Sequence, residues 1–245
     1  MTKKSEARLR GEMSLLEHLD ELRRRLRIAI IALLIGTIVG AIFTEPAIAR
    51  LVEPAQAADI DIQAIKPADN LAAFFKVSLV IGTALAMPMI MYQLFAYAAP
   101  GLEAKERRYV LLAVPFASLS FVGGAIFAGA VALPRALPFM AGVLREYIKP
   151  EWGIEYYLTF IGNIMLWSGL VFETPLVMYF LALLGVVDAK GFSKARRFVI
   201  VGAAVGAALV TPTVDIINML VIMGPFLLLY EIGIILARFA QRARE

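Results

Sequence analysis

Long apolar blocks separated by short charged segments dominate the pattern of side chains along the chain. Two examples are Ile28–Phe43 and Tyr109–Leu133. A helix that crosses about 30 Å of hydrocarbon needs about 20 such residues. The pattern therefore predicts an all-α polytopic membrane protein with six transmembrane helices, near residues 26–44, 71–98, 109–134, 158–185, 197–212 and 216–237.

The fifth and sixth of these predicted helices are short. Only fourteen residues separate Arg197 from Pro212, and they form about 21 Å of helix, which is less than an average bilayer. Glu231 interrupts the apolar run of the sixth helix. Pro88 and Pro175 are expected to kink the second and fourth helices. The bundle should therefore be thin on the side of its last two helices.

The composition agrees with a membrane protein and also gives an orientation. The chain is 60% hydrophobic and 18% charged, with a mean hydropathy of +0.78, whereas soluble domains are about half apolar and a quarter charged. Eighteen Lys and Arg residues fall on one side of the predicted spans and five on the other. Because cytoplasmic loops carry the excess of basic residues, both termini are predicted to face the cytoplasm.

The net charge of +4 is thus explained by topology and does not indicate nucleic-acid binding. Trp152, Tyr156 and Tyr157 lie on the opposite side and are typical of an aromatic belt at the membrane interface. No repeat divides the chain, so residues 1–245 are expected to form a single integral membrane domain with a cytoplasmic lead-in, residues 1–25. The outer loops have room for short helices, and Pro46–Val52 is one candidate.

The side-chain inventory argues against an enzyme and against a cofactor. There is no cysteine and only one histidine, His18. A membrane-embedded zinc protease needs two histidines around a glutamate, and a Gly-rich phosphate loop is also missing from the sequence. We therefore expect no catalytic residue, no metal site and no cofactor.

The amino-terminal segment is the most informative stretch. Ser14 and Glu17 have capping-box spacing. The opposite faces of the helix are formed by a leucine stripe (Leu15, Leu19, Leu22 and Leu26) and a charged face (Glu17, His18, Asp20, Glu21, Arg24 and Arg25). Periodicity alone favours an amphipathic interfacial helix that leads into the first span, with Asp20–Arg24 and Glu21–Arg25 as ion pairs four residues apart.

The segment Ala99–Arg108 opens with a Pro-Gly turn and then concentrates charge. Glu103 and Arg107 can pair four residues apart, which leaves Glu106 without an obvious basic partner. On spacing alone, this segment is a solvated helix start with arginines that set the topology.

Four charged residues near or within the predicted spans need an explanation. Glu173 lies near the middle of the fourth helix, where an ionised group costs about 2.5–3.5 kcal/mol or more, so it should face a wet cavity or a partner. We favour a functional role for it. Asp215 is explained as a helix cap, Glu231 as an interfacial group, and Lys76 as a snorkelling side chain or the partner of a buried acid.

Together these segments resemble the TatC family, the multispanning subunit of the twin-arginine protein translocase. The resemblance covers about residues 14–239 and is specific because several short motifs occur in the right order on six helices. The motifs are His18–Leu26, Tyr92–Leu102, Glu106–Arg108, Phe172–Pro175, Thr211–Pro212 and Glu231–Gly233, with Pro54 in the first outer loop.

The resemblance implies a glove-shaped bundle in the cytoplasmic (inner) membrane that carries out no catalysis. Such a subunit binds the twin-arginine signal peptides of folded cargo and assembles with single-span TatA- and TatB-type partners and with further copies of itself. The residues that it assigns to signal-peptide binding are Glu21, Glu106, Leu19, Arg23 and Tyr97. Glu173 matches the buried acid of the family, in a concave wet pocket, and Pro54, Asp215 and Glu231 match further family positions.

Two positions depart from the family pattern. The family often has phenylalanine where Tyr97 stands, and proline beside the acid after Thr211–Pro212, where this chain has Val214–Ile216.

An alternative function is a small secondary transporter that uses Glu173 as a proton or ion site. Against it, the six helices lack an evident two-half repeat.

Overall fold

The computed structural model describes residues 15–98, 104–142, 146–147, 149–210 and 216–244. Helices account for nearly all of them. The elements in chain order are α2 (Leu15–Ile42), α3 (Thr44–Ala57), β1 (Asp61–Gln63), α4 (Asp69–Ala98), α5 (Ala104–Phe127), the π-helical segment η2 (Ala128–Ala132), α6 (Leu133–Gly142), β2 (Glu151–Gly153), α7 (Ile154–Phe172), α8 (Thr174–Leu183), α9 (Ala189–Val210) and α10 (Ile216–Arg244).

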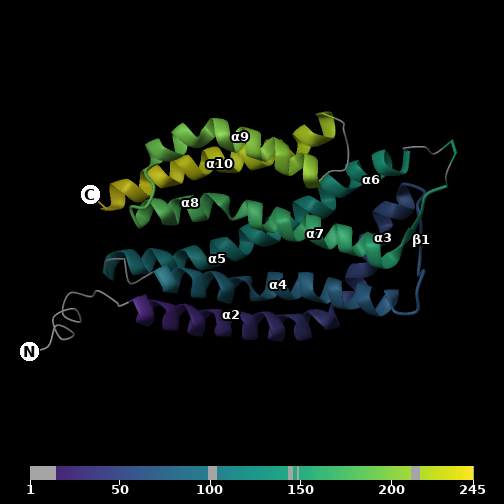
Figure 1. Cartoon of the computed structure of the whole chain (residues 1–245), viewed down its shortest axis with the longest axis horizontal. Coiled ribbons are helices and arrows are strands. Elements are labelled where there is room, and N and C mark those ends of the chain that lie inside the picture. The colour runs from purple at the N-terminus through teal and green to yellow at the C-terminus, as the bar shows by residue number, and fades with distance from the viewer. Residues whose placement is uncertain (1–14, 99–103, 143–145, 148, 211–215, 245) are drawn as a thin grey trace, which may run out of the picture.

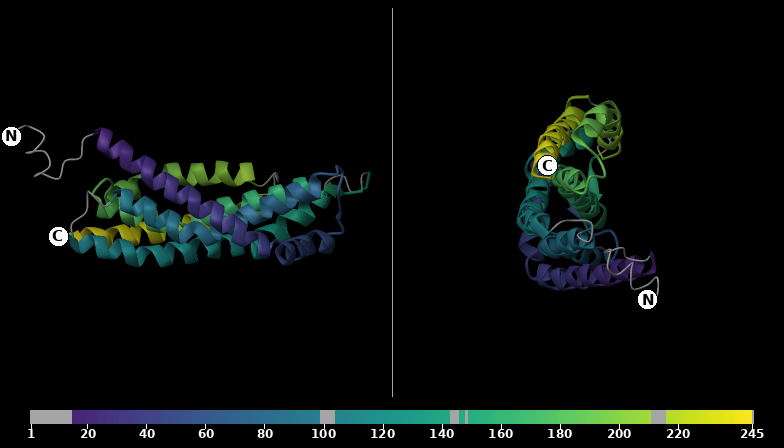
Figure 2. Two further views of the ribbon diagram at one scale, coloured as in Figure 1. Left: turned by 90° about the horizontal axis from the view of Figure 1, so that it is seen from below. Right: turned by 90° about the vertical axis from the view of Figure 1, so that its left-hand side faces the viewer.

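The long helices run side by side along one axis, and the connections collect at its two ends (Figure 1). The start of α2, the end of α4, the start of α5 and the end of α10 share one end, while α3 and the strands lie at the other. Viewed along this axis, the helices follow a curved line from α2 to α9 (Figure 2). This outline agrees with the predicted glove-shaped bundle. It also puts both ends of the described chain on the same side.

Five helical stretches among the described residues are long and apolar enough to cross a membrane: Leu16–Ile42, Asp69–Tyr97, Val114–Gly142, Ile154–Leu183 and Met223–Arg242. They match five of the six predicted spans. The remaining one falls on α9, whose first nine residues include four basic side chains. Only thirteen residues follow Arg197 in this helix, about 20 Å of length. The count of six spans and the orientation of the termini therefore remain predictions.

The helix boundaries differ from the predicted ones in three places. The amphipathic lead-in and the first span, with an expected boundary near residue 26, form one continuous helix, α2. The third predicted span consists of α5, η2 and α6 in succession, and the fourth is divided into α7 and α8 at Glu173. Pro88, by contrast, lies inside the uninterrupted α4. The short outer helix predicted around Pro46–Val52 is confirmed as α3.

Glycines bring α2 and α4 into backbone contact. A Cβ atom on Gly82 of α4 would lie 2.5 Å from the backbone nitrogen of Thr37 in α2, and one on Gly36 would lie 2.5 Å from the carbonyl oxygen of Gly82. A Cβ on Gly40 would meet the carbonyl oxygen of Ser78 at 2.8 Å. Gly36 and Gly40 are four residues apart and so share one face of α2. This is the small-residue packing typical of membrane helices.

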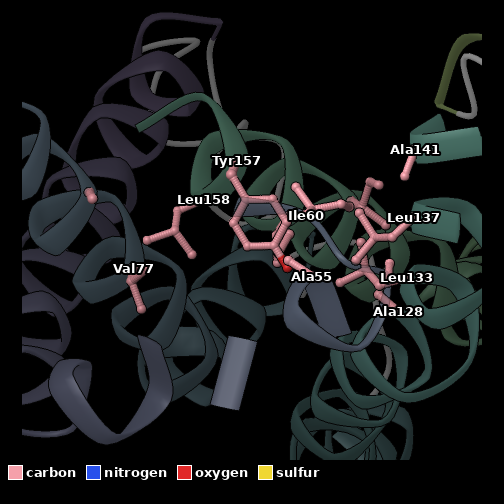
Figure 3. Packing of buried hydrophobic residues seen from close by; sticks show 13 residues of the cluster. Ala55, Ile60, Val77, Ala128, Leu133, Leu137, Ala141, Tyr157 and Leu158 are labelled. Carbon is pink, nitrogen blue, oxygen red and sulfur yellow. The ribbon is translucent and has the colours of Figure 1, made fainter. Parts of the chain in front are cut away.

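A buried cluster stabilises the end of the bundle that holds α3 and the strands (Figure 3). The Tyr157 side chain of α7 lies within it, and its hydroxyl donates a hydrogen bond to the carbonyl oxygen of Leu51 in α3, at 2.7 Å. Beside the cluster, β1 and β2 pair in parallel, with Asp61 opposite Glu151. The exposed Lys149 side chain donates a hydrogen bond to Asp61, which raises the pKa of the Lys149 ammonium group. The sequence interpretation contained no strand at this end.

A second buried cluster lies where α4, α5, α8 and α10 meet. At its centre the rings of Phe95 in α4 and Phe180 in α8 stack with centroids 4.2 Å apart. Phe95 is only three residues from the end of α4. This contact therefore holds the last turns of α4 in place, next to the first turns of α2.

Candidate functional site

Two aromatic side chains join the first turns of α2 to the last turns of α4. His18 of α2 and Tyr97 of α4 stack with ring centroids 4.5 Å apart and an angle of 26° between the rings. Stacked rings at this separation contribute about 0.5–1.5 kcal/mol beyond the area that they bury. The contact places the side of α2 that carries His18, Glu21 and Arg25 against α4 at this end of the bundle.

One turn further along, an arginine links the same two helices. Arg25 donates from Nε to Oε1 of Glu21 at 2.6 Å and from Nη1 to Oε1 of Gln93, on α4, at 3.1 Å. The Arg25 and Glu21 side chains are 24% and 20% exposed, and Gln93 is buried. The predicted Glu21–Arg25 pair is therefore confirmed, and its setting is less solvated than that of a free helix surface.

This arrangement can bind a guanidinium group. Hydrogen bonds between ionised groups are shorter and about twice as strong as neutral ones, and a carboxylate can accept two parallel bonds from one arginine. The short bond between Arg25 and Glu21 is an example within the chain itself. Because Gln93 is buried, solvent has little access to the guanidinium group on the side that faces α4.

Two further predicted residues lie on the same turns of α2 but project away from α4. Leu19 is 59% exposed, and Arg23 is also exposed. They are therefore accessible to a partner at this end of the bundle. Tyr97 is partly buried because it stacks on His18.

Several predicted residues lie outside the described part of the chain. For Glu106, the backbone belongs to the first turn of α5, at the same end as Glu21, but the side chain is not described. Asp215, Glu103 and Ser14 of the predicted capping box also lie outside the described residues.

Glu173 lies at the junction of α7 and α8. Pro175 is the second residue of α8 and has no backbone N–H to donate to the preceding turn, so the helix breaks here. The Glu173 side chain is only 3% exposed, and neither carboxyl oxygen has a hydrogen-bond partner among the described residues. This differs from the expected wet pocket: within the single chain, the helix break turns the carboxyl group into the packed interior.

An apolar cavity of about 320 Å³ lies next to this junction, between α7, α9 and α10. Its walls include the neighbours of Glu173 in α7, Val171 and Phe172, together with Gly202 and Gly206 of α9. Glu173 itself is not part of the lining. The acid and the cavity are thus adjacent but separate.

The other predicted polar residues have structural partners. The Lys76 ammonium binds Oε1 of Glu155, in the first turn of α7, at 2.8 Å. Lys76 therefore pairs with an acid, but that acid is 28% exposed rather than buried inside the bundle. Oε2 of Glu231 binds Arg196 at 2.6 Å, and both side chains are about half exposed. Pro54 lies in the last turn of α3, where its carbonyl oxygen accepts a hydrogen bond from Ala58.

Gln93 is the residue that the sequence interpretation did not identify. The quoted motif Tyr92–Leu102 contains it, but only its family resemblance was used. The available indication was physical: an amide inside an apolar helix needs a hydrogen-bond partner when it is buried. That rule would have selected Gln93, although not its contact with Arg25.

Comparisons with known proteins agree on one family. The family model "Sec-independent protein translocase protein (TatC)" matches residues 17–225. The chain is 34% identical to Sec-independent protein translocase protein TatCy of Bacillus subtilis (strain 168) over 236 residues, covering 96% of this chain and 92% of that protein. It is 33% identical to TatC of Aquifex aeolicus (strain VF5) over 237 residues, covering 95% and 98%.

The fold leads to the same result. A crystal structure of the twin-arginine translocase receptor TatC superimposes with a TM-score of 0.76 at 32% identity, covering 91% of this chain and 99% of that one. A second crystal structure of that receptor, in DDM, gives a TM-score of 0.78 at 33% identity, covering 90% and 99%. The chain therefore belongs to the TatC family of Sec-independent protein translocase proteins, the multispanning subunits of the twin-arginine translocase.

Proposed function

We propose that this chain is the signal-peptide receptor of its translocase. Twin-arginine signal peptides of folded cargo bind at the end of the bundle where α2, α4 and α5 meet. Glu21 and Glu106 each take one guanidinium group, and Leu19, Arg23 and Tyr97 complete the surface. The observation that carries this proposal is the partly buried Glu21 carboxylate, which already binds a guanidinium group at 2.6 Å.

The burial of Glu21 matters for specificity. A fully exposed ion pair contributes only about 0.2–1 kcal/mol and would not separate a signal peptide from any other cationic peptide. A partly desolvated carboxylate forms stronger charge-assisted bonds. Arginine presents a planar fork of donors to such a group, whereas the lysine ammonium is a compact, strongly hydrated charge. A twin-lysine peptide of equal charge should therefore bind much more weakly.

The proposed subunit carries out no catalysis. It lies in the cytoplasmic membrane with both termini in the cytoplasm, and it assembles with single-span TatA- and TatB-type subunits and with further copies of itself. We assign Glu173 to this assembly. Its support is the position of the carboxyl group, which is buried without a hydrogen-bond partner among the described residues and lies next to an apolar cavity of about 320 Å³.

Peptide binding to the purified protein tests the receptor assignment. Glu21→Gln and Glu106→Gln should each weaken binding of a twin-arginine peptide by about 1 kcal/mol or more, because each removes a charged acceptor. Asp20→Asn is the matched control, since Asp20 is an exposed acid on the same helix as Glu21 and its loss changes the net charge equally. Circular dichroism of each variant would verify the helix content.

If both glutamine variants bind twin-arginine peptide as tightly as the wild type, recognition lies elsewhere. The same holds if Asp20→Asn loses as much affinity as Glu21→Gln, since only net charge would then matter.

The alternative function, transport of a small ion or solute through Glu173, makes a different prediction. Proteoliposomes containing the chain alone would then accumulate a labelled substrate or protons. The buried position of Glu173 gives this alternative no support, because its carboxyl oxygens have no hydrogen-bond partner among the described residues.

A further inference from the structure

We propose that Arg25 occupies the place of a signal-peptide arginine in the empty receptor, and that Gln93 positions it there. The two residues thereby set the affinity threshold of the site. This inference rests on the proposed function of Glu21. It adds that the recognition carboxylate is not free before the peptide arrives.

The geometry shows one guanidinium group shared by acceptors on two helices. Nε of Arg25 binds Glu21 on its own helix, and Nη1 binds Gln93 on α4. These two nitrogens belong to one rigid plane, so both bonds form from a single side-chain orientation. A lysine at position 25 has one nitrogen and could not reproduce the pair of contacts with the same geometry.

Gln93 is a fixed anchor for this arginine. Its side chain is buried, and its amide nitrogen lies 3.3 Å from Sδ of Met89, one turn earlier on α4. That contact leaves Oε1 for Arg25. Because the glutamine is held by packing, it restricts the rotamers of Arg25. A restricted arginine loses less conformational entropy when it binds Glu21 than a free arginine would.

An incoming guanidinium group must therefore compete with Arg25 for Glu21. Competition weakens every cationic ligand by the same factor, so it does not alter the ratio between arginine and lysine peptides. Instead it lowers all affinities together. Peptides with low affinity then no longer bind at the concentrations at which they occur. A twin-arginine peptide engages two acids and so still displaces Arg25 from Glu21.

Displacement also has a structural consequence. When the peptide takes Glu21, Arg25 keeps its contact with Gln93 on α4 or loses both contacts. In either case the Glu21–Arg25 ion pair within α2 is replaced by an ion pair between Glu21 and the peptide, at the point where α2 contacts α4. The His18–Tyr97 stack, one to two turns away, still joins the helices there.

The test measures the affinity of a twin-arginine peptide for three variants of the full chain in detergent. Arg25→Gln removes the competitor, and Arg24→Gln is its matched control, because Arg24 is exposed on the same helix and carries the same charge. Gln93→Met removes the anchor without any change of charge and replaces the amide with an apolar side chain of similar length. We expect Arg25→Gln to bind the peptide about two- to fivefold more tightly than Arg24→Gln, the range that corresponds to a partly exposed ion pair. Gln93→Met should bind more tightly than the wild type.

A third comparison separates this inference from the proposed function. In a Glu21→Gln background, Arg25→Gln should give no more gain than Arg24→Gln, because there is no carboxylate left to release. The inference is overturned if Arg25→Gln and Arg24→Gln bind alike and Gln93→Met equals the wild type, while Glu21→Gln still loses affinity. If Glu21→Gln itself binds normally, the receptor site is wrong as well.

A change in peptide affinity can be distinguished from a loss of folding. Helix content and the thermal midpoint are measured for each variant, and Arg25→Lys provides a milder change that keeps the charge. It should also bind the peptide more tightly than the wild type, and binding equal to the wild type in both Arg25→Lys and Gln93→Met would contradict the proposal.

Discussion

At the scale of single residues, Glu173 is the side chain whose surroundings suit it least. Both carboxyl oxygens are buried without a hydrogen-bond partner among the described residues. A buried polar group left unsatisfied costs about 1–3 kcal/mol, and an ionised one within the membrane costs more. A residue at this position therefore contributes little to the stability of the isolated chain, which is consistent with a role in assembly.

A substitution measures this cost directly. Glu173→Leu should raise the free energy of unfolding of the solubilised protein by about 1–3 kcal/mol, since it replaces an unsatisfied carboxyl group by an apolar side chain of similar size. Thermal unfolding monitored by circular dichroism would detect the shift. A loss of stability greater than about 1 kcal/mol would instead mean that the carboxyl group has a partner in the folded protein.

The sequence showed which charged residues lie within apolar runs, but it did not show which residues they contact. The depth of Glu173 within an apolar run was sufficient to single it out, but the expectation drawn from that depth was a wet cavity or a partner, whereas the side chain is buried. The partner of Lys76 lies 79 positions away, and that of Arg25 on α4 lies 68 positions away. Such pairs depend on which helices pack together, and a single sequence contains no information on helix packing beyond its small-residue patterns.

At the scale of elements, the contact between α2 and α4 depends on small residues. Only 11% of the most apolar stretch of α2 is buried, so this helix is attached to the bundle mainly through α4. The closest point is at Gly82, where an added Cβ would lie within 2.5 Å of the Thr37 backbone. Backbone atoms cannot move aside as a flexible side chain can, so the helices would have to separate.

Gly82→Ala should therefore destabilise the protein by about 1–3 kcal/mol, the usual cost of overpacking a well-packed interior. Gly123→Ala is the matched control, because a Cβ at Gly123 in α5 meets nothing within 4 Å. It should be neutral or slightly stabilising, since alanine favours a helix more than glycine does. Chemical or thermal unfolding of both variants would measure the difference in their stabilities. Equal stability of the two would show that the α2–α4 contact is looser than the structure indicates.

Helix existence was predictable from the sequence, whereas the exact effect of each proline on its helix was not. Pro88 and Pro175 both predicted kinks: α4 continues as one helix through Pro88, whereas the fourth span is divided at Glu173, just before Pro175. Membrane helices tolerate proline where neighbouring groups satisfy the freed carbonyl, so the local sequence does not decide the outcome. The Gly36–Gly40 spacing was visible in the sequence and would have predicted a close helix contact.

At the scale of the whole molecule, the start of α2 and the end of α10 lie at the same end of the bundle, and both are rich in basic residues (Figure 1). The same end holds the start of α9, with four basic residues in its first nine. The predicted orientation depends on this asymmetry of eighteen Lys and Arg residues against five. It assigns the basic end to the cytoplasm.

Single cysteines can test this orientation, because the natural chain contains none. Gln63→Cys in β1 and Lys190→Cys at the start of α9 both lie at exposed positions. A membrane-impermeant thiol reagent added outside intact cells, or spheroplasts if an outer membrane is present, should label position 63, and label position 190 only after the membrane is permeabilised. Labelling of position 190 in intact membranes would reverse the orientation and remove the proposed receptor site from the cytoplasmic side.

The parallel pairing of β1 with β2 also orders the events of biosynthesis. Asp61 and Lys149, which meet beside these strands, are 88 positions apart in the chain. At an elongation rate of about 5–20 residues per second, the ribosome needs about 4–18 s to make the second after the first. Within that interval α4 is completed and can pack against α2, whereas the edge of β1 remains unpaired until β2 has been made. The end of the bundle that holds the strands can therefore close only after the segment that follows the third predicted span has been made.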